Sequence, residues 1–257
     1  MPVNATVVVC AHNEEACIRE ALEAILKQST PPILIILVAD RCTDRTVQIS
    51  RALLPKGSIL LEKGRSLWKN SYAENLEIGR RNAIGELLAI IDADILVPPR
   101  FLESLSAFYD GWASVSALVR TDPRRGWLNK LVSFWERSYV LTPMGKEARG
   151  GARIVSLKAL GDIGGFQDVM APDTDLDIRL RQRGLRVRID PGLVALHLRR
   201  MSLARSIPYQ IRAGRARREL SVSILDLRTL NRSFKAICPI RLLTGEPERS
   251  RSRGLSA

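Results

Sequence analysis

The sequence has no apolar run long enough to cross a membrane. A spanning helix needs about 20 consecutive apolar residues, whereas the longest apolar runs here, 33–39 and 87–91, are ended by charged residues. The run 5–11 has no basic residues ahead of it and leads directly into polar residues, which is unlike a secretory signal and typical of a buried first strand. We therefore expect a protein that is soluble or peripheral to a membrane.

Cysteine and histidine are scarce, at four and two residues among 257. The sequence contains no Cys-x-x-Cys pair and no cluster of histidines, so it predicts neither a structural zinc site nor a disulfide framework. Free cysteines suit a reducing compartment. We expect the protein in the cytoplasm, with a peripheral position at the inner face of the membrane as an open alternative.

Aromatic residues are rare in the basic C-terminal part of the chain. The net charge is +13, and residues 199–257 contribute +10 of it through 14 Lys/Arg against 4 Asp/Glu. A basic segment can bind nucleic acid, anionic lipid headgroups or phosphate-bearing substrates. Recognition of single strands relies on stacking aromatics, and this segment holds only Tyr209 and Phe234. Nucleic acid is therefore not an expected partner, and a basic nucleic-acid-binding protein stays the weaker alternative.

What the sequence does contain is an alternation of β-branched apolar runs with helical patterns. Strand, helix, strand and helix are expected at 3–11, 14–28, 33–39 and 45–54. This alternation predicts an α/β fold with a mostly parallel central sheet flanked by helices, in which a ligand binds beyond the carboxyl ends of the strands. Further strands are expected at 58–62, 87–91, 114–121, 150–155, 185–189 and 193–198, and helices at 77–83, 100–109, 157–160 and 172–183. Residues 63–75 have an irregular polar pattern, and 122–150 have mixed periodicity.

Two carboxylates, Asp92 and Asp94, stand at the end of the apolar run 87–91. Burying both at that point without a cation would be costly. Because the strand breaks there, both side chains can turn toward one divalent ion and a bound diphosphate. The motif indicates a site for Mg²⁺ or Mn²⁺, although an Asp-x-Asp pattern on its own also occurs at solvated strand ends.

Several segments stand in a characteristic order around this pair. They are 7–15 (VVVCAHNEE), 38–46 (VADRCTDRT), 83–86 (AIGE) ahead of Asp92-Ala93-Asp94, then 151–153 (GAR), 164–166 (GGF) and 173–176 (DTDL). In order and spacing they resemble family 2 glycosyltransferases, over about residues 5–198. The resemblance implies a GT-A fold with a Rossmann-like sheet, and transfer of a sugar from a nucleotide-sugar to an acceptor hydroxyl.

The resemblance also implies which residues hold the nucleotide-sugar. Asp40, at a strand end, would accept the imide or amide N–H of the base, while main-chain groups near Ala11 bracket the ribose and base. Arg81 would reach the diphosphate, although it is displaced from the position of the family's usual Arg-Asn pair. The full implied set is Ala11, Asn13, Glu15, Asp40, Arg81, Asp92 and Ala93.

Metal-binding and catalytic roles follow from the same resemblance. Asp92 and Asp94 would bind Mg²⁺ or Mn²⁺, and His197 is either a third ligand or a structural histidine. Asp173 matches the catalytic base, which takes the proton of the acceptor hydroxyl in an inverting reaction. Pro172 stands where an acidic residue commonly precedes that base, so Asp175 stays open as an alternative.

The expected partners are a UDP- or GDP-linked donor and a glycan or lipid acceptor, lipid phosphates included. We expect a catalytic domain at 1–198, with a nucleotide-sugar-binding half at 1–100 and an acceptor half at 101–198, then a basic helical extension at 199–245 and a disordered tail at 246–257. The extension spaces Leu203, Ile207 and Ile211 among arginines. Helices of this kind would partly cover the active site and meet an anionic membrane surface.

A nucleotidyltransferase stays open as a second enzyme class, because it can share this sheet and a carboxylate pair. Such an enzyme would usually carry a Gly-rich loop with Lys or Arg after the first strand, to hold a triphosphate. Here that position is occupied by residues 11–15 (AHNEE), which are acidic.

Overall fold

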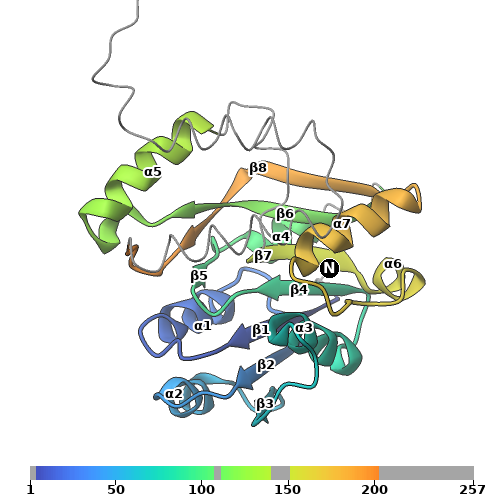
Figure 1. Ribbon diagram of the computed structural model, residues 1–257, viewed down its shortest axis with the longest axis horizontal. Helices are drawn as coiled ribbons and strands as arrows, with labels where there is room; N and C mark the ends of the chain where they lie inside the picture. Colours follow the sequence, from blue (N-terminus) through green and yellow to red (C-terminus); the bar gives the residue numbers. More distant parts are fainter. Residues whose placement is uncertain (1–3, 107–110, 140–150, 203–257) are drawn as a thin grey trace, which may run out of the picture. The chain divides into compact units, whose positions relative to one another are not determined.

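Eight strands form the central sheet of the residues that this computed structural model describes, 4–106, 111–139 and 151–202. They pair in the order β3-β2-β1-β4-β7-β6-β8-β5 (Figure 1). The strands are β1 (Ala5–Ala11), β2 (Leu34–Asp40), β3 (Ile59–Lys63), β4 (Leu87–Ile91), β5 (Ile95–Leu96), β6 (Trp112–Thr121), β7 (Ala152–Ser156) and β8 (Arg186–His197). The helices are α1 (Ile18–Leu26), α2 (Thr46–Leu53), α3 (Ser71–Asn82), α4 (Phe101–Ser106), the 3₁₀ turn η2 (Pro123–Arg125), α5 (Trp127–Tyr139), α6 (Leu157–Asp162) and α7 (Pro172–Gln182).

The described residues all fall in one compact unit, Met1–Arg217. The expected basic extension at 199–245 lies outside the described residues apart from its first four positions, and the expected tail at 246–257 lies wholly outside them. Within the described ranges, none of the helices combines the length and the apolar character that crossing a bilayer requires.

The two halves of the sheet differ in strand direction. β3, β2, β1 and β4 are parallel, as the strand-helix alternation predicts. In the second half β7 is antiparallel to both β4 and β6, β5 is antiparallel to β8, and β6 and β8 are parallel. The predicted α/β fold is thus confirmed, with a parallel first half and a mixed second half.

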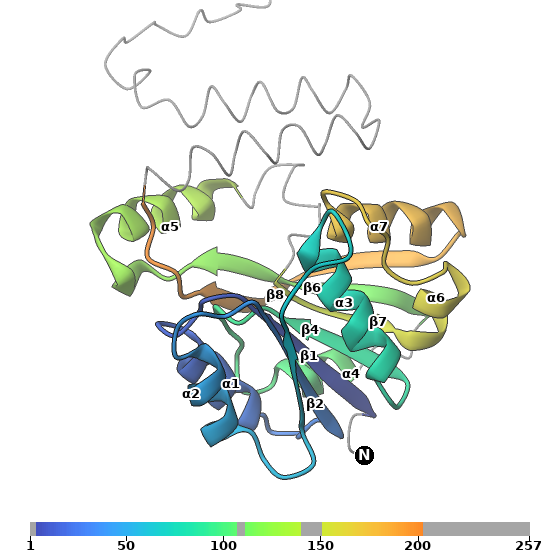
Figure 2. The ribbon, with the colours of Figure 1, turned by 60° about the horizontal axis from the view of Figure 1, so that its bottom comes forward.

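Both faces of the sheet are covered, because the apolar residues of each central strand point alternately to opposite sides. In β1, Val7 and Val9 pack in the cluster that contains Ile18 and Leu22 of α1. Val8 instead joins the cluster that contains residues of α3, α6 and α7. Figures 1 and 2 show α1 and α2 on one side of the sheet and α3, α6 and α7 on the other.

A glycine sets the distance between α3 and the sheet. A Cβ atom added to Gly79 would lie 2.5 Å from Cγ1 of Val8, which is too close for any side chain. The helix therefore packs directly on β1. This close approach holds the first turn of α3 at the carboxyl edge of the sheet, where the functional residues gather.

Three elements differ most from the sequence-based expectations, apart from the two-residue strand β5, which was not expected. α3 begins at Ser71 rather than at 77, because the Asn70 side chain accepts hydrogen bonds from the amides of Tyr72 and Ala73 and caps the helix. The expected strands 185–189 and 193–198 are one strand, β8, which absorbs Pro191 and Gly192 at a register shift opposite Ala117 and Leu118 of β6. α5 occupies part of 122–150, where the periodicity indicated no element.

Candidate active site

The loops that follow β1 and β2 are locked together at the carboxyl edge of the sheet. Asn13 Oδ1 accepts a 2.8 Å hydrogen bond from the Thr43 amide. Glu15 Oε2 accepts from the Arg45 amide at 3.1 Å, and Asp44 Oδ2 in turn accepts from the Glu15 amide at 3.0 Å. Asn13 has a positive φ of 54°, which an Asn tolerates better than most residues. Asn13 and Glu15 therefore shape the rim of the site in this structure.

Asp40 lies at the end of β2 and is 2% exposed. Its carboxylate accepts hydrogen bonds from Arg41 Nε at 2.8 Å, from the Ser71 hydroxyl, and from Asn75 Nδ2 at 3.3 Å. Burial alone would raise the pKa of this carboxyl, but these donors hold it at about 2. Asp40 is therefore ionised, and a nucleotide base would have to share it with the half-exposed Arg41.

The first turn of α3 connects the Asp40 region to the aspartate pair. Ser71 donates to Asp40, and the next residue, Tyr72, donates from its hydroxyl to Asp92 Oδ1 at 2.8 Å. The cap residue of this helix is fixed by the segment between α6 and α7, since Asp168 accepts from the amides of Lys69 and Asn70 at 2.9 and 2.8 Å. One helix start therefore positions both ends of the candidate donor site.

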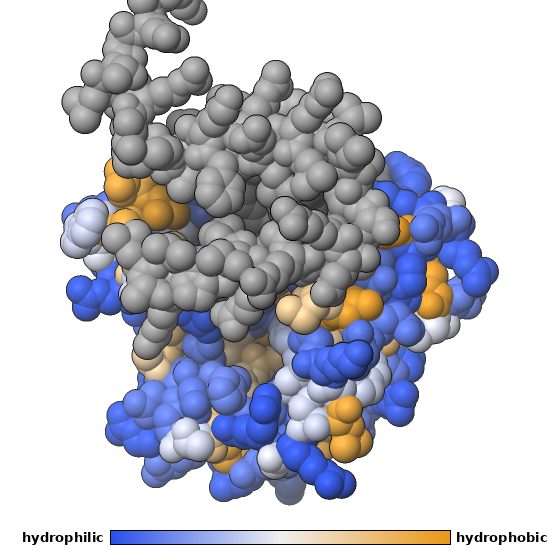
Figure 3. All heavy atoms as spheres, viewed as in Figure 1, coloured by the Kyte–Doolittle hydropathy of each residue, from blue (hydrophilic) through white to orange (hydrophobic). Residues whose placement is uncertain are grey.

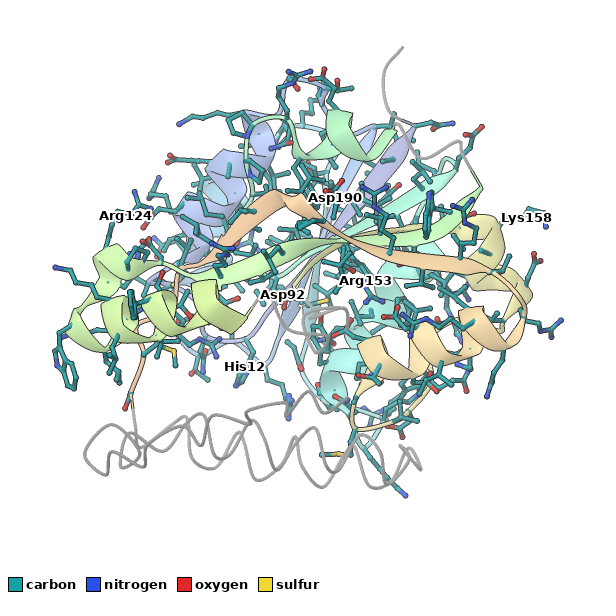
Figure 4. The ribbon with its side chains drawn as sticks, turned by 90° about the horizontal axis from the view of Figure 1, so that it is seen from above. His12, Asp92, Arg124, Arg153, Lys158 and Asp190 are labelled. Atoms are coloured by element: carbon teal, nitrogen blue, oxygen red, sulfur yellow. The ribbon has the colours of Figure 1, made fainter. Side chains whose placement is uncertain are left out.

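Asp92 follows β4 directly and lies in the interior, beneath β6 and β8 in Figure 4. Its amide donates to the Gly151 carbonyl at 2.9 Å, and Ala93 beside it is buried. Burial, together with the negative charges of Asp94 and Asp173, raises the pKa of Asp92 to about 7. The charges of Asp94 and Asp173 thus oppose the ionisation of Asp92, which is the electrostatic situation that a bound cation relieves.

Asp94 is surrounded by basic groups. Its Oδ2 lies 3.1 Å from His197 Nε2 and 3.1 Å from an Arg199 guanidinium nitrogen. The same guanidinium donates to Glu14, which follows β1. Burial would raise the pKa of Asp94, but the hydrogen bond from His197 and the charges of His197 and Arg199 lower it. The ends of β1, β4 and β8 are joined through this network.

Asp173 and Asp175, the two candidates for the base, have different surroundings. Asp175 is bound to Arg179 of the same helix, with an N–O distance of 2.6 Å. Asp173 lies in the first turn of α7, and its Oδ1 is buried without a hydrogen-bond partner among the described residues. Burial raises the pKa of Asp173, against the opposing charge of Arg153. An uncommitted carboxylate of raised pKa suits a proton acceptor.

Arg153, in β7, is completely buried and lies near the centre of the view in Figure 4. One guanidinium nitrogen lies 3.1 Å from Asp177 Oδ1 and donates to the Asp173 carbonyl at 3.4 Å. A buried arginine needs such a partner to be tolerated. It thus ties β7 to the start of α7, the turn that carries Asp173.

The structure does not bring Arg81 to this site. Its Nε donates to Glu77 at 2.8 Å, and the residue lies in the last turn of α3. At about 1.5 Å per residue it is about 14 Å along the helix from Tyr72. Arg81 therefore does not lie where a contact with a diphosphate would need it, because α3 runs away from the carboxyl edge of the sheet. The other implied residues end or follow β1, β2, β4 and β8 or lie in the first turn of α7: Ala11, Asn13, Glu15, Asp40, Asp92, Ala93, Asp94, His197 and Asp173.

Whether the site suits a divalent cation depends on its carboxylates. Among the described residues, no three His, Cys, Asp or Glu side chains are already grouped as a metal site. Mg²⁺ is commonly held by one or two carboxylates plus substrate phosphates and water, so Asp92 and Asp94 are sufficient protein ligands. The raised pKa of Asp92, caused by burial and by the charges of Asp94 and Asp173, fits a site that a cation would stabilise. His197 could join only after leaving Asp94.

Sequence reasoning missed Glu14, Tyr72 and Arg153 as members of this site. Glu14 and Tyr72 join it through contacts with residues 185 and 20 positions away in the chain, for which no spacing pattern exists. Arg153 belongs to one of the quoted motifs. An arginine within an otherwise apolar strand pattern indicates that its guanidinium is buried and paired with a carboxylate. The Asp175–Arg179 pair, at helical i,i+4 spacing, was also visible in the sequence.

Comparison with known proteins identifies the family. A model described as glycosyl transferase family 2 matches residues 6–153, more than half of the chain. The chain belongs to glycosyl transferase family 2. Family 2 membership confirms the resemblance seen in the motifs and favours a glycosyltransferase over the nucleotidyltransferase alternative. An uncharacterized glycosyltransferase of Haemophilus influenzae is 26% identical over 117 residues, 44% of this chain. The match spans 35% of that relative's length.

Solved structures share the family 2 fold at low identity. A mannosyltransferase of Pyrobaculum calidifontis in complex with GDP-Man and Mn²⁺ has a TM-score of 0.64 and 23% identity, covering 84% of this chain and 62% of that one. Glucosyl-3-phosphoglycerate synthase of Mycobacterium tuberculosis, with Mn²⁺, UDP and glucosyl-3-phosphoglycerate, has a TM-score of 0.56 and 20% identity, covering 79% and 74%. S. aureus TarS 1–349 with UDP-GlcNAc has a TM-score of 0.55 and 20% identity, covering 80% and 61%. These similarities confirm the GT-A type of fold.

Proposed function

We propose that this chain transfers a sugar from a nucleotide-diphosphate sugar to an acceptor hydroxyl, with inversion at the anomeric carbon and with the help of Mg²⁺ or Mn²⁺. One observation carries the proposal. The negative charges of Asp94, which follows β4, and of Asp173, in the first turn of α7, raise the pKa of the buried Asp92. Asp173 Oδ1 is buried and has no hydrogen-bond partner among the described residues.

The nucleotide would lie over the ends of β1 and β2. Asp40 is ionised and can accept an N–H of the base once Arg41 shifts, and the ordered loops that contain Ala11, Asn13 and Glu15 present main-chain groups beside it. Relatives of the same fold were solved with GDP-Man, with UDP and with UDP-GlcNAc. A UDP- or GDP-linked donor is therefore the class to test first.

Asp92 and Asp94 would hold the divalent cation. When bound, the cation neutralises charge on the diphosphate and so favours its departure. Tyr72 orients Asp92 through its hydroxyl, whereas His197 and Arg199 contact Asp94 Oδ2, which a cation would have to share or take from them. The long guanidinium side chain of Arg199 can also reach phosphate oxygens, with which arginine forms strong charge-assisted bonds.

In the transfer step Asp173 acts as the general base. It takes the proton of the acceptor hydroxyl as that oxygen forms a bond to the anomeric carbon. The bond from the anomeric carbon to the diphosphate oxygen breaks on the opposite face, and the diphosphate leaves with the electron pair. The result is inversion. Arg153 holds the turn of Asp173 in place and favours its ionised form.

The acceptor is a glycan or a lipid, with lipid phosphates as the subclass that the basic C-terminal segment favours. The 14 Lys/Arg of residues 199–257 provide a charge that would meet anionic phosphates or an anionic bilayer at the inner face of a membrane. Among glycan acceptors, the same charge favours those that carry phosphate.

Thermal unfolding with nucleotides tests the donor site. UDP, GDP, dTDP and CDP would each be added with Mn²⁺, with Mg²⁺ or with a chelator. A ligand at about 100 times its Kd stabilises the fold by about 2.7 kcal/mol, so we expect one nucleotide to raise the Tm by about 5 °C or more, only with metal.

Two variants make the test specific. Asp94→Asn preserves shape but removes a charge from the site, and it should abolish the metal-dependent shift. Asp162→Asn removes an exposed carboxylate that is paired with Lys158 on α6, and it should leave the shift unchanged. A shift that persists in Asp94→Asn, or no shift with any nucleotide, would contradict the proposed donor site.

A further inference from the structure

Helix α5 has its polar side turned inward. Asn129 and Ser133 are buried, and Asn129 donates to the Arg199 carbonyl at 3.2 Å and accepts from the Met201 amide at 2.8 Å. Glu136 accepts from the amide and the hydroxyl of Thr121, at 2.7 and 3.1 Å. These hydrogen bonds attach α5 to the end of β6 and to the segment after β8, and so fix the orientation of the helix.

The opposite side of α5 is apolar and faces outward. Trp127, Leu131 and Phe134 are 73%, 58% and 72% exposed. Their spacing of four and three residues places them on one helical face, and we call these three residues the α5 stripe. In Figure 3 a hydrophobic surface patch lies over the position of α5. Most surface helices of soluble domains have the reverse arrangement, so this face is built to meet an apolar partner.

Positive charge borders the stripe. Lys130 is exposed on the same helix. Arg200 is also exposed and lies at the start of the helix, with Nε 3.7 Å from the position of a Cβ on Gly126. The acidic residue of the helix, Glu136, is turned inward to Thr121. The outward face therefore combines an aromatic and aliphatic stripe with cations.

We propose that the α5 stripe docks on an anionic lipid bilayer. Tryptophan and phenylalanine insert at the boundary between headgroups and acyl chains, while neighbouring lysine and arginine bind lipid phosphates. A second copy of the chain is a poorer fit, since a two-fold contact through this face would bring the Lys130 and Arg200 cations of both copies together. The chemistry of the face is that of an interfacial membrane helix.

Docking through α5 would place the bilayer beside the active site. Asn129 holds the segment from Arg199 to Met201, and Arg199 contacts both Asp94 and Glu14. A lipid acceptor, if the proposed function is correct, would then reach the site from the membrane. The docking itself does not depend on transfer, because it can be measured without donor, metal or acceptor.

Vesicle flotation of the full chain tests the docking. Vesicles of phosphatidylcholine alone would be compared with vesicles that contain a third phosphatidylglycerol. We expect the wild type to float with the anionic vesicles. Trp127→Gln/Leu131→Gln/Phe134→Gln should bind at least about tenfold more weakly, since three interfacial side chains are lost. Ile84→Gln, a change at an exposed apolar residue of another loop, should bind as the wild type does.

A fluorescence measurement separates α5 from the basic C-terminal segment. Quenching of tryptophan emission by brominated lipids should be strong in the wild type and clearly reduced in Trp127→Phe, although both keep residues 203–257 intact. Flotation of the triple variant equal to the wild type would overturn the proposal. A wild type that does not bind vesicles would also overturn the proposal. This holds whether light scattering shows a monomer or a dimer that the triple variant dissociates.

Discussion

The Arg199 guanidinium lies 3.1 Å from Asp94 Oδ2 and also donates to Glu14, and so occupies the carboxylate that we assign to the metal. This contact joins the end of β8 to the loops after β4 and β1. The positive charge of Arg199 neutralises the carboxylate of Asp94, as a bound divalent cation would. The Arg199 guanidinium and the divalent cation should therefore compete for Asp94 Oδ2.

Arg199→Met should therefore bind Mn²⁺ more tightly than the wild type in the absence of nucleotide. Removing one competing charge at close range in a partly buried site is expected to lower the Kd for Mn²⁺ by about three- to tenfold. Electron paramagnetic resonance of free Mn²⁺ measures this directly. Arg200→Met, which removes the neighbouring exposed charge, is the control and should change the Kd much less. Weaker Mn²⁺ binding in Arg199→Met would show that the arginine supports the metal rather than replacing it.

Asp173→Asn should lose sugar transfer while keeping nucleotide binding. Loss of a general base typically lowers kcat by about 10²–10⁴-fold. Because Asp173 Oδ1 has no hydrogen-bond partner among the described residues, the change to an amide breaks no hydrogen bond at this oxygen and the Tm should change little. Asp175→Asn weakens the ion pair with Arg179 and should lower the Tm more than it lowers kcat. The opposite ranking of the two variants in kcat would assign the base to Asp175.

As the pH is lowered, activity should be lost at a higher pH than the ordinary pKa of an aspartate would predict. Burial raises the pKa of Asp173, and the base must be ionised, so activity is present above this raised pKa and is lost as the pH falls through it. Arg153→Met/Asp177→Asn removes the buried ion pair as a unit, along with the charge of Arg153 that favours ionised Asp173. The acid limb of kcat/KM for the acceptor should then move to still higher pH. An unchanged limb would show that another group controls it.

The stability contributed by Glu74 should depend on pH in a defined window. This buried carboxylate accepts from Lys63 Nζ at 2.9 Å, from Ser66 Oγ at 2.6 Å and from the Leu67 amide at 3.0 Å. Burial alone would raise its pKa, but these donors lower it from 4.5 to about 2. Its contribution is therefore complete above pH 4.5 and is lost as the pH falls through about 2.

Urea unfolding of the wild type and of Glu74→Gln at several pH values measures this contribution. The difference in free energy of unfolding should be largest near neutral pH and should shrink below pH 4.5. Glu62→Gln, at an exposed carboxylate paired with Arg51, should show a small difference at every pH. A Glu74→Gln difference that does not vary with pH would mean that the charge of Glu74 is not what stabilises the loop.

Much of the fold was readable from local patterns. The runs that became β1, β2 and β4 are apolar on both faces, which is what a central parallel strand requires, and the helical spacing of Ile18, Leu22 and Ile25 predicted α1. The elements that were missed lacked such a signal. Helix α5 turns Asn129 and Ser133 inward and Trp127 outward, so its pattern is the reverse of the usual one.

The sequence by itself determined where the chemistry lies along the chain: Asp40 ends one buried strand, Asp92-Ala93-Asp94 follows another, and Asp173 follows the proline that starts α7. Only the tertiary structure decided which of these groups act on one another. Tyr72 reaches Asp92 because Gly79 lets α3 lie directly on β1, and Arg199 reaches Asp94 and Glu14 because β8 ends beside β5. Arg81 is carried away because α3 runs back from the carboxyl edge. Strand and helix propensities are local properties, whereas these contacts depend on packing between segments far apart in the chain.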